Sequence, residues 1–435
     1  MRFAVFFTVL FTVLVGLCVY IHRRASTVLG LSRRGRLLLS GLLGAGVVAS
    51  TVGRLLGGLL PDVILRAFST FGMTILLAVI ISSVLLAVVD LPRILVGLIG
   101  RLIPRREQAV DASAEVPIPA PALKKEENKN IDSTTTTNTD NAADQASTTN
   151  TNTALTRRAF VSHAAAGSAF FIGTGSAAYG AIFGRHDYIL EEVAIPIPGL
   201  PKSLDGFSIA QLSDIHIGLY VGEPELRAAE ELVRKARVDL VVMTGDLIDS
   251  HARYAPELGR LVRRLGPLAR RGVVAIPGNH DYFAGIDATL AALRGGGATV
   301  LRNSGIPIGD AGGSFALLGV DDVWAARLNP GRGPSLELAT ASVPRDLPRV
   351  LLCHNPVYFP EAAGDIALQL SGHTHGGQVN LVVRPADLVL PYGYVAGQYE
   401  RNGSKLYINR GFGTAGPPAR VQAPPEVSRI VLVAA

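Results

Sequence analysis

Long apolar stretches fill much of the first half of the chain, whereas short apolar runs separated by Gly, Pro, Asp and Asn fill the second half. Four stretches approach or exceed the roughly 20 apolar residues that cross a bilayer as a helix. They cover residues 3–21, 37–60, 67–89 and 159–183. Arg54 interrupts the second stretch, so a shallow or re-entrant segment is an alternative there. We predict a membrane region with about three spans in residues 1–106 and a fourth span or export-signal segment in residues 157–184.

Arginine clusters beside these stretches predict their orientation, because positive residues collect on the cytoplasmic side. The clusters comprise Arg23, Arg24, Arg33, Arg34, Arg36, Arg101, Arg105, Arg106, Arg157 and Arg158. All of them can be cytoplasmic only if the chain crosses four times and the part after residue 184 lies outside. If residues 37–60 do not span, the first cluster and the later ones lie on opposite sides. "TRRAFV" also resembles a twin-arginine export signal, although its internal position is unusual, and under either interpretation the following domain is outside.

Composition agrees with a partly membrane-embedded chain. Hydrophobic residues make up 48% and charged residues 17%, against roughly 25% charged in an ordinary soluble domain. The net charge of +6 comes with basic residues beside apolar runs, and no aromatic–basic stripe of the kind that grips single strands is evident. We therefore expect no nucleic-acid partner. Residues 107–156 are predicted to be a flexible polar linker, because they offer too little apolar surface to offset the entropy of ordering.

Residues 185–435 have the pattern of an α/β domain. Six short apolar runs suit strands buried on both faces. These runs are residues 207–213, 238–244, 272–277, 315–320, 349–353 and 366–371. Between the first three runs, residues 223–237 and 255–271 place leucine and alanine at helical spacing among charges. Alternating strands and helices predict βαβ units and a largely parallel sheet.

Polar side chains follow five of these runs at the point where each run ends. They are Asp214, His216, Asp246, Asp249, Asn279, His280, His354, His373 and His375. Since ligands of open α/β sheets collect at the carboxyl ends of the strands, we expect these groups to converge on one patch. Residues two apart in extended backbone face the same way. His373 and His375 should then share one side, as should Asp214 and His216.

These groups amount to about twice the ligand set of one tetrahedral ion. The absence of thiolate favours manganese, iron or zinc, and two divalent metal ions are the simplest interpretation. Two such ions can activate a bridging water and brace a phosphoryl group during in-line attack. The pattern therefore predicts phosphate chemistry.

"DIH", "GDLID", "GNHD", "CHNP" and "SGHTHGGQ" together resemble the calcineurin-like metallophosphoesterase superfamily. "GGQV" and the C-terminal "LYINRGFGTAGPPARVQAPPEVSRIVL" are similar to its membrane-anchored, YkuE-like bacterial branch. The resemblance covers about residues 190–435 and leaves the first 185 residues unexplained. It implies a four-layer αββα sandwich with two mixed sheets, here preceded by transmembrane helices.

The resemblance also implies a role for each site residue. One metal ion would be bound by Asp214, His216 and His375, the other by Asn279, His354 and His373, and both by Asp246. The implied catalytic residues are His280, which would stabilise or protonate the leaving oxygen, and Asp249, which would orient its imidazole. An alternative for Asp249 is a helix cap. Arg420 and residues 411–416 either line the substrate side or form a structural turn.

The sequence thus predicts a membrane-anchored, metal-dependent phosphoric ester hydrolase acting on phosphate monoesters or diesters. The expected location is a bacterial cytoplasmic membrane, crossed several times, with the catalytic domain on the extracytoplasmic side. Phospholipids, lipid-linked pyrophosphates and cell-envelope phosphates are candidate substrates on the basis of location alone. The alternatives are a non-catalytic sensor or interaction protein and a protein phosphatase.

Overall fold

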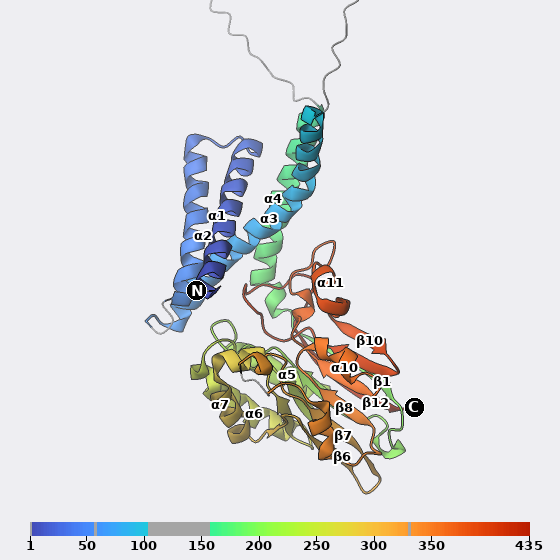
Figure 1. The fold of residues 1–435 in the computed structure, drawn as a ribbon. Coiled ribbons are helices and arrows are strands. Elements are labelled where there is room, and N and C mark those ends of the chain that lie inside the picture. The colour runs from blue at the N-terminus through green and yellow to red at the C-terminus, as the bar shows by residue number, and fades with distance from the viewer. Residues whose placement is uncertain (1, 56–58, 103–156, 329–331) are drawn as a thin grey trace, which may run out of the picture. The chain divides into compact units, whose positions relative to one another are not determined.

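The computed structural model describes residues 2–55, 59–102, 157–328 and 332–435. The linker predicted for residues 107–156 lies outside the described residues. Helices α1 (Arg2–Val28), α2 (Arg33–Leu55), α3 (Asp62–Leu102) and α4 (Arg157–Ile182) precede the strands (Figure 1). Among the described helices, the segment Asp62–Val96 of α3 is long and apolar enough to cross a membrane. The other spans stay predictions.

Among the described residues, chain contacts group those within 2–86 and 166–435 in one unit and place residues 87–102 and 157–165 in another. In the second unit, the Arg93 guanidinium on α3 donates a hydrogen bond of 2.8 Å to the Ser162 hydroxyl on α4. The strands all belong to the first unit.

Two six-stranded sheets form the centre of the domain. The first has the order β1 (Ile189–Ile197), β12 (Glu426–Ala434), β2 (Ser208–Leu212), β3 (Leu240–Thr244), β4 (Val273–Ile276) and β5 (Thr299–Val300). The second has the order β10 (Gly397–Arg401), β11 (Ser404–Ile408), β9 (Leu368–Ser371), β8 (Arg349–Leu352), β7 (Gly313–Gly319) and β6 (Ser304–Asp310). Strands β2 to β5 are parallel, as are β11, β9, β8 and β7. All six predicted strands are confirmed, but they divide between two sheets.

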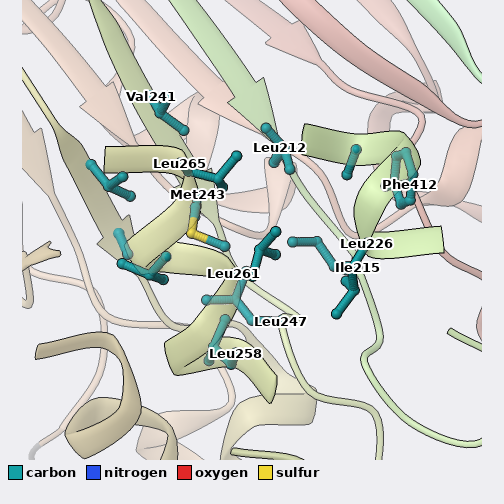
Figure 2. Close-up of a cluster of buried hydrophobic side chains, with 14 of the residues drawn as sticks. Leu212, Ile215, Leu226, Val241, Met243, Leu247, Leu258, Leu261, Leu265 and Phe412 are labelled. Carbon is teal, nitrogen blue, oxygen red and sulfur yellow. The ribbon is translucent and has the colours of Figure 1, made fainter. Parts of the chain in front are cut away.

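Side chains on β3 alternate between two hydrophobic clusters because successive residues of a strand face opposite ways. Leu240 and Val242 join the cluster that fills the space between the sheets. Val241 and Met243 instead face helices α5 (Glu223–Ala236), α6 (Ala255–Leu265) and α7 (Asn279–Gly296). Figure 2 shows this second cluster, in which strand side chains meet leucines of the helices.

The second sheet is covered on its other face by α9 (Leu336–Ala341) and α10 (Phe359–Ala362), whose apolar side chains pack with those of β7, β8 and β11. The remaining short helices are α8 (Ala325–Leu328) and α11 (Ala386–Val389). Helices, sheet, sheet and helices make the expected four-layer sandwich, and this fold prediction is confirmed.

Local sequence signals fix the ends of the covering helices. The Glu225 carboxylate accepts a hydrogen bond of 2.9 Å from the Gly222 N–H at the start of α5, which satisfies one of the free donors near the helix start. Helix α6 ends at Leu265, before Gly266 and Pro267, where the chain continues as a short 3-10 turn. The prediction of a helix over residues 255–271 was therefore too long, because Pro267 has no N–H with which to continue the helical hydrogen bonds.

The loops after β2 and β3 are joined by backbone hydrogen bonds. The N–H groups of Asp214 and His216 donate to the carbonyls of Gly245 and Asp246, each at 3.0 Å. The N–H of Gly372, after β9, donates to the carbonyl of His354, after β8, also at 3.0 Å. Within each sheet, these bonds join neighbouring loops at the carboxyl ends of the strands.

Candidate active site

The structure brings all nine residues singled out from the sequence into one cluster at the carboxyl ends of β2, β3, β4, β8 and β9. Asp214, His216, Asp246, Asn279, His354 and His375 are buried, whereas Asp249, His280 and His373 are partly exposed. Residues from both sheets contribute, so the site forms only when the two sheets are packed together.

One group of possible ligands consists of Asp214, His216 and His375. The Nε2 atoms of His216 and His375 lie 3.1 Å apart. The Nε2 of His375 also lies 3.4 Å from Oδ1 of Asp214. Their donor atoms therefore face a common point.

A second group consists of Asp246, His354 and His373. The Nε2 of His354 lies 3.2 Å from Nδ1 of His373, 3.3 Å from Oδ1 of Asp246 and 3.2 Å from Oδ1 of Asn279. The other carboxylate oxygen of Asp246 lies 3.7 Å from Nε2 of His216. Asp246 thus stands between the two groups.

The spacing of these atoms suits divalent cations. Ligand atoms bonded at 2.0–2.2 Å to one ion lie about 3 to 3.6 Å apart, depending on the coordination geometry. The separations between neighbouring donor atoms here run from 3.1 to 3.7 Å. The donors are carboxylates, imidazoles and one amide, and no thiolate is among them. Hard or borderline metal ions prefer such donors. The residues present fit the two ions that the sequence predicts.

The backbone of the site differs from the extended conformation that the spacing rule assumes. Asp214, His216, Asp246 and His375 have φ of 52°, and His373 has φ of 72°. Non-glycine residues seldom adopt this left-handed region, and such strain collects at functional sites. The prediction that His373 and His375 share one side of an extended segment was wrong. They lie in a turn after β9, and each joins a different ligand group.

Glycines allow the loops to approach the ligands closely. A Cβ on Gly372 would overlap the Ser213 hydroxyl and the Asp214 carboxylate, and one on Gly278 would overlap the backbone and carboxylate of Asp246. The N–H of His373 donates to the Asp214 carboxylate at 3.0 Å. Gly372 is therefore required by this approach.

A hydrogen bond to the backbone determines which ring nitrogen of His354 faces the cluster. The Nδ1 of His354 lies 2.8 Å from the carbonyl of Thr244, and a carbonyl can only accept, so Nδ1 carries the proton. Its Nε2 then faces the cluster, and in the neutral ring this nitrogen carries the lone pair. Burial opposes the charged ring, but contact with Asp246 raises the pKa of His354 well above its ordinary value. Reciprocally, although burial opposes it, His354 holds the pKa of Asp246 well below its usual range.

The two histidines of the glycine-rich turn are kept neutral. Burial, with His216 and Arg420 nearby, lowers the pKa of His375 well below its ordinary value. Burial and the neighbouring His354 lower the pKa of His373 to about 4. A neutral imidazole offers a lone pair, which is the form that binds a metal ion.

Asp249 and His280 lie together at the edge of the cluster. The Nδ1 of His280 donates a hydrogen bond of 2.8 Å to the carbonyl of Asp249 and lies 3.6 Å from its carboxylate. The same carboxylate lies 3.5 Å from Nδ1 of His216. Burial opposes protonation, but the Asp249 carboxylate and Asp246 raise the pKa of His280 to about 9. Asp249 caps no helix, because α6 begins six residues later, so that alternative is wrong.

Arg420 is a structural residue. Its side chain is buried and donates to the carbonyls of Gly413, Arg410 and Ala423 at 2.6–3.0 Å, and its Nη2 lies 3.2 Å from Nδ1 of His375. The substrate-lining alternative for Arg420 was therefore wrong. Within residues 411–416, Thr414, Ala415 and Gly416 line a cavity that also contacts His280.

Sequence reasoning missed Asp281, the last residue of "GNHD". Its buried carboxylate accepts hydrogen bonds from the N–H groups of Leu247 and Ile248, each at 3.0 Å, and of Gly278 at 2.8 Å. These bonds tie the loop after β3 to the start of α7. The position of an aspartate two residues after Asn279 was a usable signal, since acidic residues favour the first turn of a helix.

Comparisons with known proteins show what the chain is similar to. The family model described as calcineurin-like phosphoesterase matches residues 207–377. The chain is 34% identical over 269 residues to the "Transmembrane protein with metallophosphoesterase domain" of Danio rerio, which covers 59% of this chain and 60% of that protein. It is 32% identical over 240 residues to the "Uncharacterized metallophosphoesterase YkuE" of Bacillus subtilis, covering 54% of this chain and 81% of that protein. Among solved structures, a dimetal phosphatase from Danio rerio aligns with a TM-score of 0.30 and 13% identity over 48% of this chain and 88% of that chain.

Proposed function

Because the chain belongs to the calcineurin-like phosphoesterase family, we propose that it is a metal-dependent hydrolase of phosphate monoesters or diesters. The observation that carries this proposal is the pair of ligand groups with Asp246 between them. A single structural metal site needs about four ligands, whereas this arrangement offers a shared carboxylate and three further ligands on either side.

Each ligand group would hold one ion. In the proposed assignment, Asp214, His216 and His375 bind one ion, Asn279, His354 and His373 bind the other, and Asp246 contacts both. Manganese, iron and zinc suit these donors. Bound there, two cations would neutralise phosphoryl oxygens and supply a water nucleophile at neutral pH.

His280 is the proposed general acid. Its Nδ1–H is held by the Asp249 carbonyl, so its Nε2 is the nitrogen available to the oxygen of the departing alcohol. With a pKa raised to about 9, the ring carries the proton that this oxygen needs at neutral pH. Asp249 acts through the imidazole by fixing its orientation and charge.

Purified full-length protein with added manganese tests the activity. We expect hydrolysis of p-nitrophenyl phosphate, bis-p-nitrophenyl phosphate or both, and about a hundredfold loss of kcat in His280→Gln. Asp246→Asn should lower the number of ions per chain in elemental analysis. Asp287→Asn, an exposed position on the same helix, should change neither quantity. Hydrolysis that survives a chelator, or no hydrolysis at any pH, would contradict the proposal.

We also propose that the enzyme is held in a bacterial cytoplasmic membrane by several helices, with the catalytic domain on the extracytoplasmic side. The apolar length of α3 and the arginine clusters beside the apolar stretches support this. The Arg157–Arg158 pair would then serve as a topology signal or engage twin-arginine export machinery. Phospholipids, lipid-linked pyrophosphates and envelope phosphates would be within reach.

A protease-protection experiment tests this orientation. Protease added to intact spheroplasts should cleave a C-terminal tag only if the catalytic domain lies outside. The same tag placed on a cytoplasmic protein is the control for lysis. A tag that is degraded only after the membrane is broken would contradict the proposed orientation.

A further inference from the structure

A cavity of about 500 Å³ opens beside His280. At one end, His280 and Asp249 belong to the proposed catalytic machinery. At the other end, the wall is made by Leu65, Ser69 and Met73 of helix α3. More than 170 residues separate these two walls in the sequence, so the cavity depends on how α3 packs against the loops of the site.

Polar contacts hold α3 against these loops. The Nε of Arg66 donates to the carbonyl of Leu219 at 2.7 Å, and the hydroxyls of Ser69 and Tyr220 are hydrogen-bonded. These contacts lie on the loop that follows His216. The carboxylate of Asp62 accepts hydrogen bonds from Arg253 at 3.2 Å and from the Tyr254 hydroxyl at 3.1 Å.

The α3 wall is apolar where it meets the cavity. Leu65 and Met73 are almost fully buried, at 1% and 7% exposure, and the hydroxyl of Ser69 is already engaged by Tyr220. Hydroxyls of a leaving group that lay against this wall would meet carbon atoms and lose hydrogen bonds to water, whereas the opposite wall offers polar side chains such as Ser250 and Arg253. An aliphatic group has no hydrogen bonds to lose at this wall, and burial of its apolar surface favours binding.

The same helix continues as the segment that is apolar enough to cross a membrane. Its outward side chains, including Phe68 and Phe71, are about half exposed, as expected of a helix surface that contacts lipid. An aliphatic chain that starts at the metal cluster and follows Leu65 and Met73 would therefore run along a helix that is apolar enough to cross a membrane.

We propose that α3 selects the substrate: the enzyme acts on membrane lipid phosphates whose leaving group carries an aliphatic chain lying against Leu65 and Met73. This inference rests on the proposed hydrolase function and deepens it by assigning the leaving-group site. The P–O bond to the lipid alcohol breaks, water supplies the new P–O bond, and the alcohol departs with a proton. Leu65 and Met73 are specificity-determining residues and take no part in the bond changes.

The test uses the full chain in lipid nanodiscs with methyl, butyl and octyl phosphate and the corresponding methyl alkyl diesters, and measures the released alcohol. We expect kcat/KM to rise with chain length, by about three- to fourfold for each methylene that becomes buried. The double variant Leu65→Gln with Met73→Gln should flatten this rise, and its thermal unfolding and metal content report whether it has folded. Phe71→Gln, an exposed position on the same helix, should keep the full rise.

A second arm identifies the source of the chain. Vesicles containing dioleoyl phosphatidic acid, as a bilayer phosphate ester, should be hydrolysed by the native enzyme and more slowly by the double variant. Hydrolysis of octyl phosphate in solution but not of the vesicle lipid would overturn the assignment to membrane lipids. Equal rates across the alkyl series, with methyl esters still cleaved, would overturn the inference and leave the hydrolase function standing. No cleavage of any ester would overturn both.

Discussion

The partly exposed ring of His280 contacts two groups of one residue, the backbone carbonyl and the carboxylate of Asp249. The carbonyl fixes which ring nitrogen carries the proton, and the carboxylate stabilises the charged ring. These contacts outweigh burial and raise the pKa of His280 to about 9. An imidazole with this pKa stays protonated at neutral pH and loses its proton only in alkaline solution.

We predict that Asp249→Asn narrows the pH range of activity. If protonated His280 is required, activity falls as the pH rises through the pKa of His280. A neutral amide cannot stabilise the imidazolium, so this pKa moves down and the alkaline limb of kcat should shift to lower pH by about one unit, equivalent to about 1.4 kcal/mol. The pH profile of kcat with saturating manganese checks this, and Asp287→Asn is the matched control. An unchanged alkaline limb would show that Asp249 does not set the charge of His280.

Gly372 offers a second test at the level of one residue. An alanine methyl at this position would overlap the Ser213 hydroxyl and the Asp214 carboxylate. We predict that Gly372→Ala lowers the free energy of unfolding by about 1–3 kcal/mol and weakens metal binding, because Asp214 must move. Thermal unfolding and metal titration measure both effects. Gly295→Ala, inside α7 with no atom within 4 Å of the added Cβ, should be neutral or slightly stabilising; an equal loss there would contradict the steric explanation.

The identity of the site residues was predictable because their motifs follow buried strands, and strand ends in α/β sheets meet at one edge. Their backbone conformation was not. The alternation rule assumes extended backbone, whereas Asp214 and His375 adopt left-handed φ values that depend on contacts with loops distant in sequence. The role of Asp281 was not predictable either, because its hydrogen-bond partners Leu247 and Ile248 belong to a loop that is distant in sequence.

At the level of elements, Asp281 connects the start of α7 to the loop after β3. Replacing its carboxylate by an amide leaves a single oxygen acceptor for the three N–H groups that Asp281 serves. We predict that Asp281→Asn costs about 1–3 kcal/mol of stability and weakens metal binding, although Asp281 lies in neither ligand group. Chemical denaturation and metal titration check this, with Asp287→Asn as the control on the same helix. Native metal affinity in the variant would show that the connection does not position the ligands.

The strands that the sequence predicted are the buried, parallel ones of the two sheets, such as β3 and β8. The predictions did not identify β1, β5, β6, β10, β11 or β12. Their residues are partly exposed or include buried polar groups, such as Glu426, which accepts a hydrogen bond from Tyr407. A short apolar run indicates a strand that is covered on both faces. A strand that is partly exposed or carries buried polar side chains has no such run in its sequence. The sequence also could not assign the six runs to two sheets, because pairing is a property of the folded chain.

For the whole molecule, the sequence predicted an apolar helix near residues 67–89 but gave no sign that α3 packs against the loops of the catalytic site. Apolar periodicity reports that a segment avoids water, and it does not report which protein surface the segment meets. Arg66 is the informative exception, since a charged residue beside an apolar stretch needs a partner or water. Its partners, the Leu219 carbonyl and the Glu225 carboxylate, lie more than 150 residues away.

We predict that Arg66→Ala loosens this packing. The variant loses the 2.7 Å hydrogen bond to Leu219 and a contact of 3.9 Å with the Glu225 carboxylate, so the loop that follows His216 should open more often. Hydrogen exchange of the full chain in nanodiscs should become faster at residues 219–222 and stay unchanged in the middle of α7, whose helical hydrogen bonds do not involve Arg66. Arg227→Ala, which removes an exposed ion pair with Glu223 on α5, should leave exchange in the loop unaltered, since exposed pairs contribute little. Because the loop also carries His216, faster exchange should be accompanied by weaker metal binding. Faster exchange with native metal affinity would show that the metal site forms independently of the contacts between α3 and this loop.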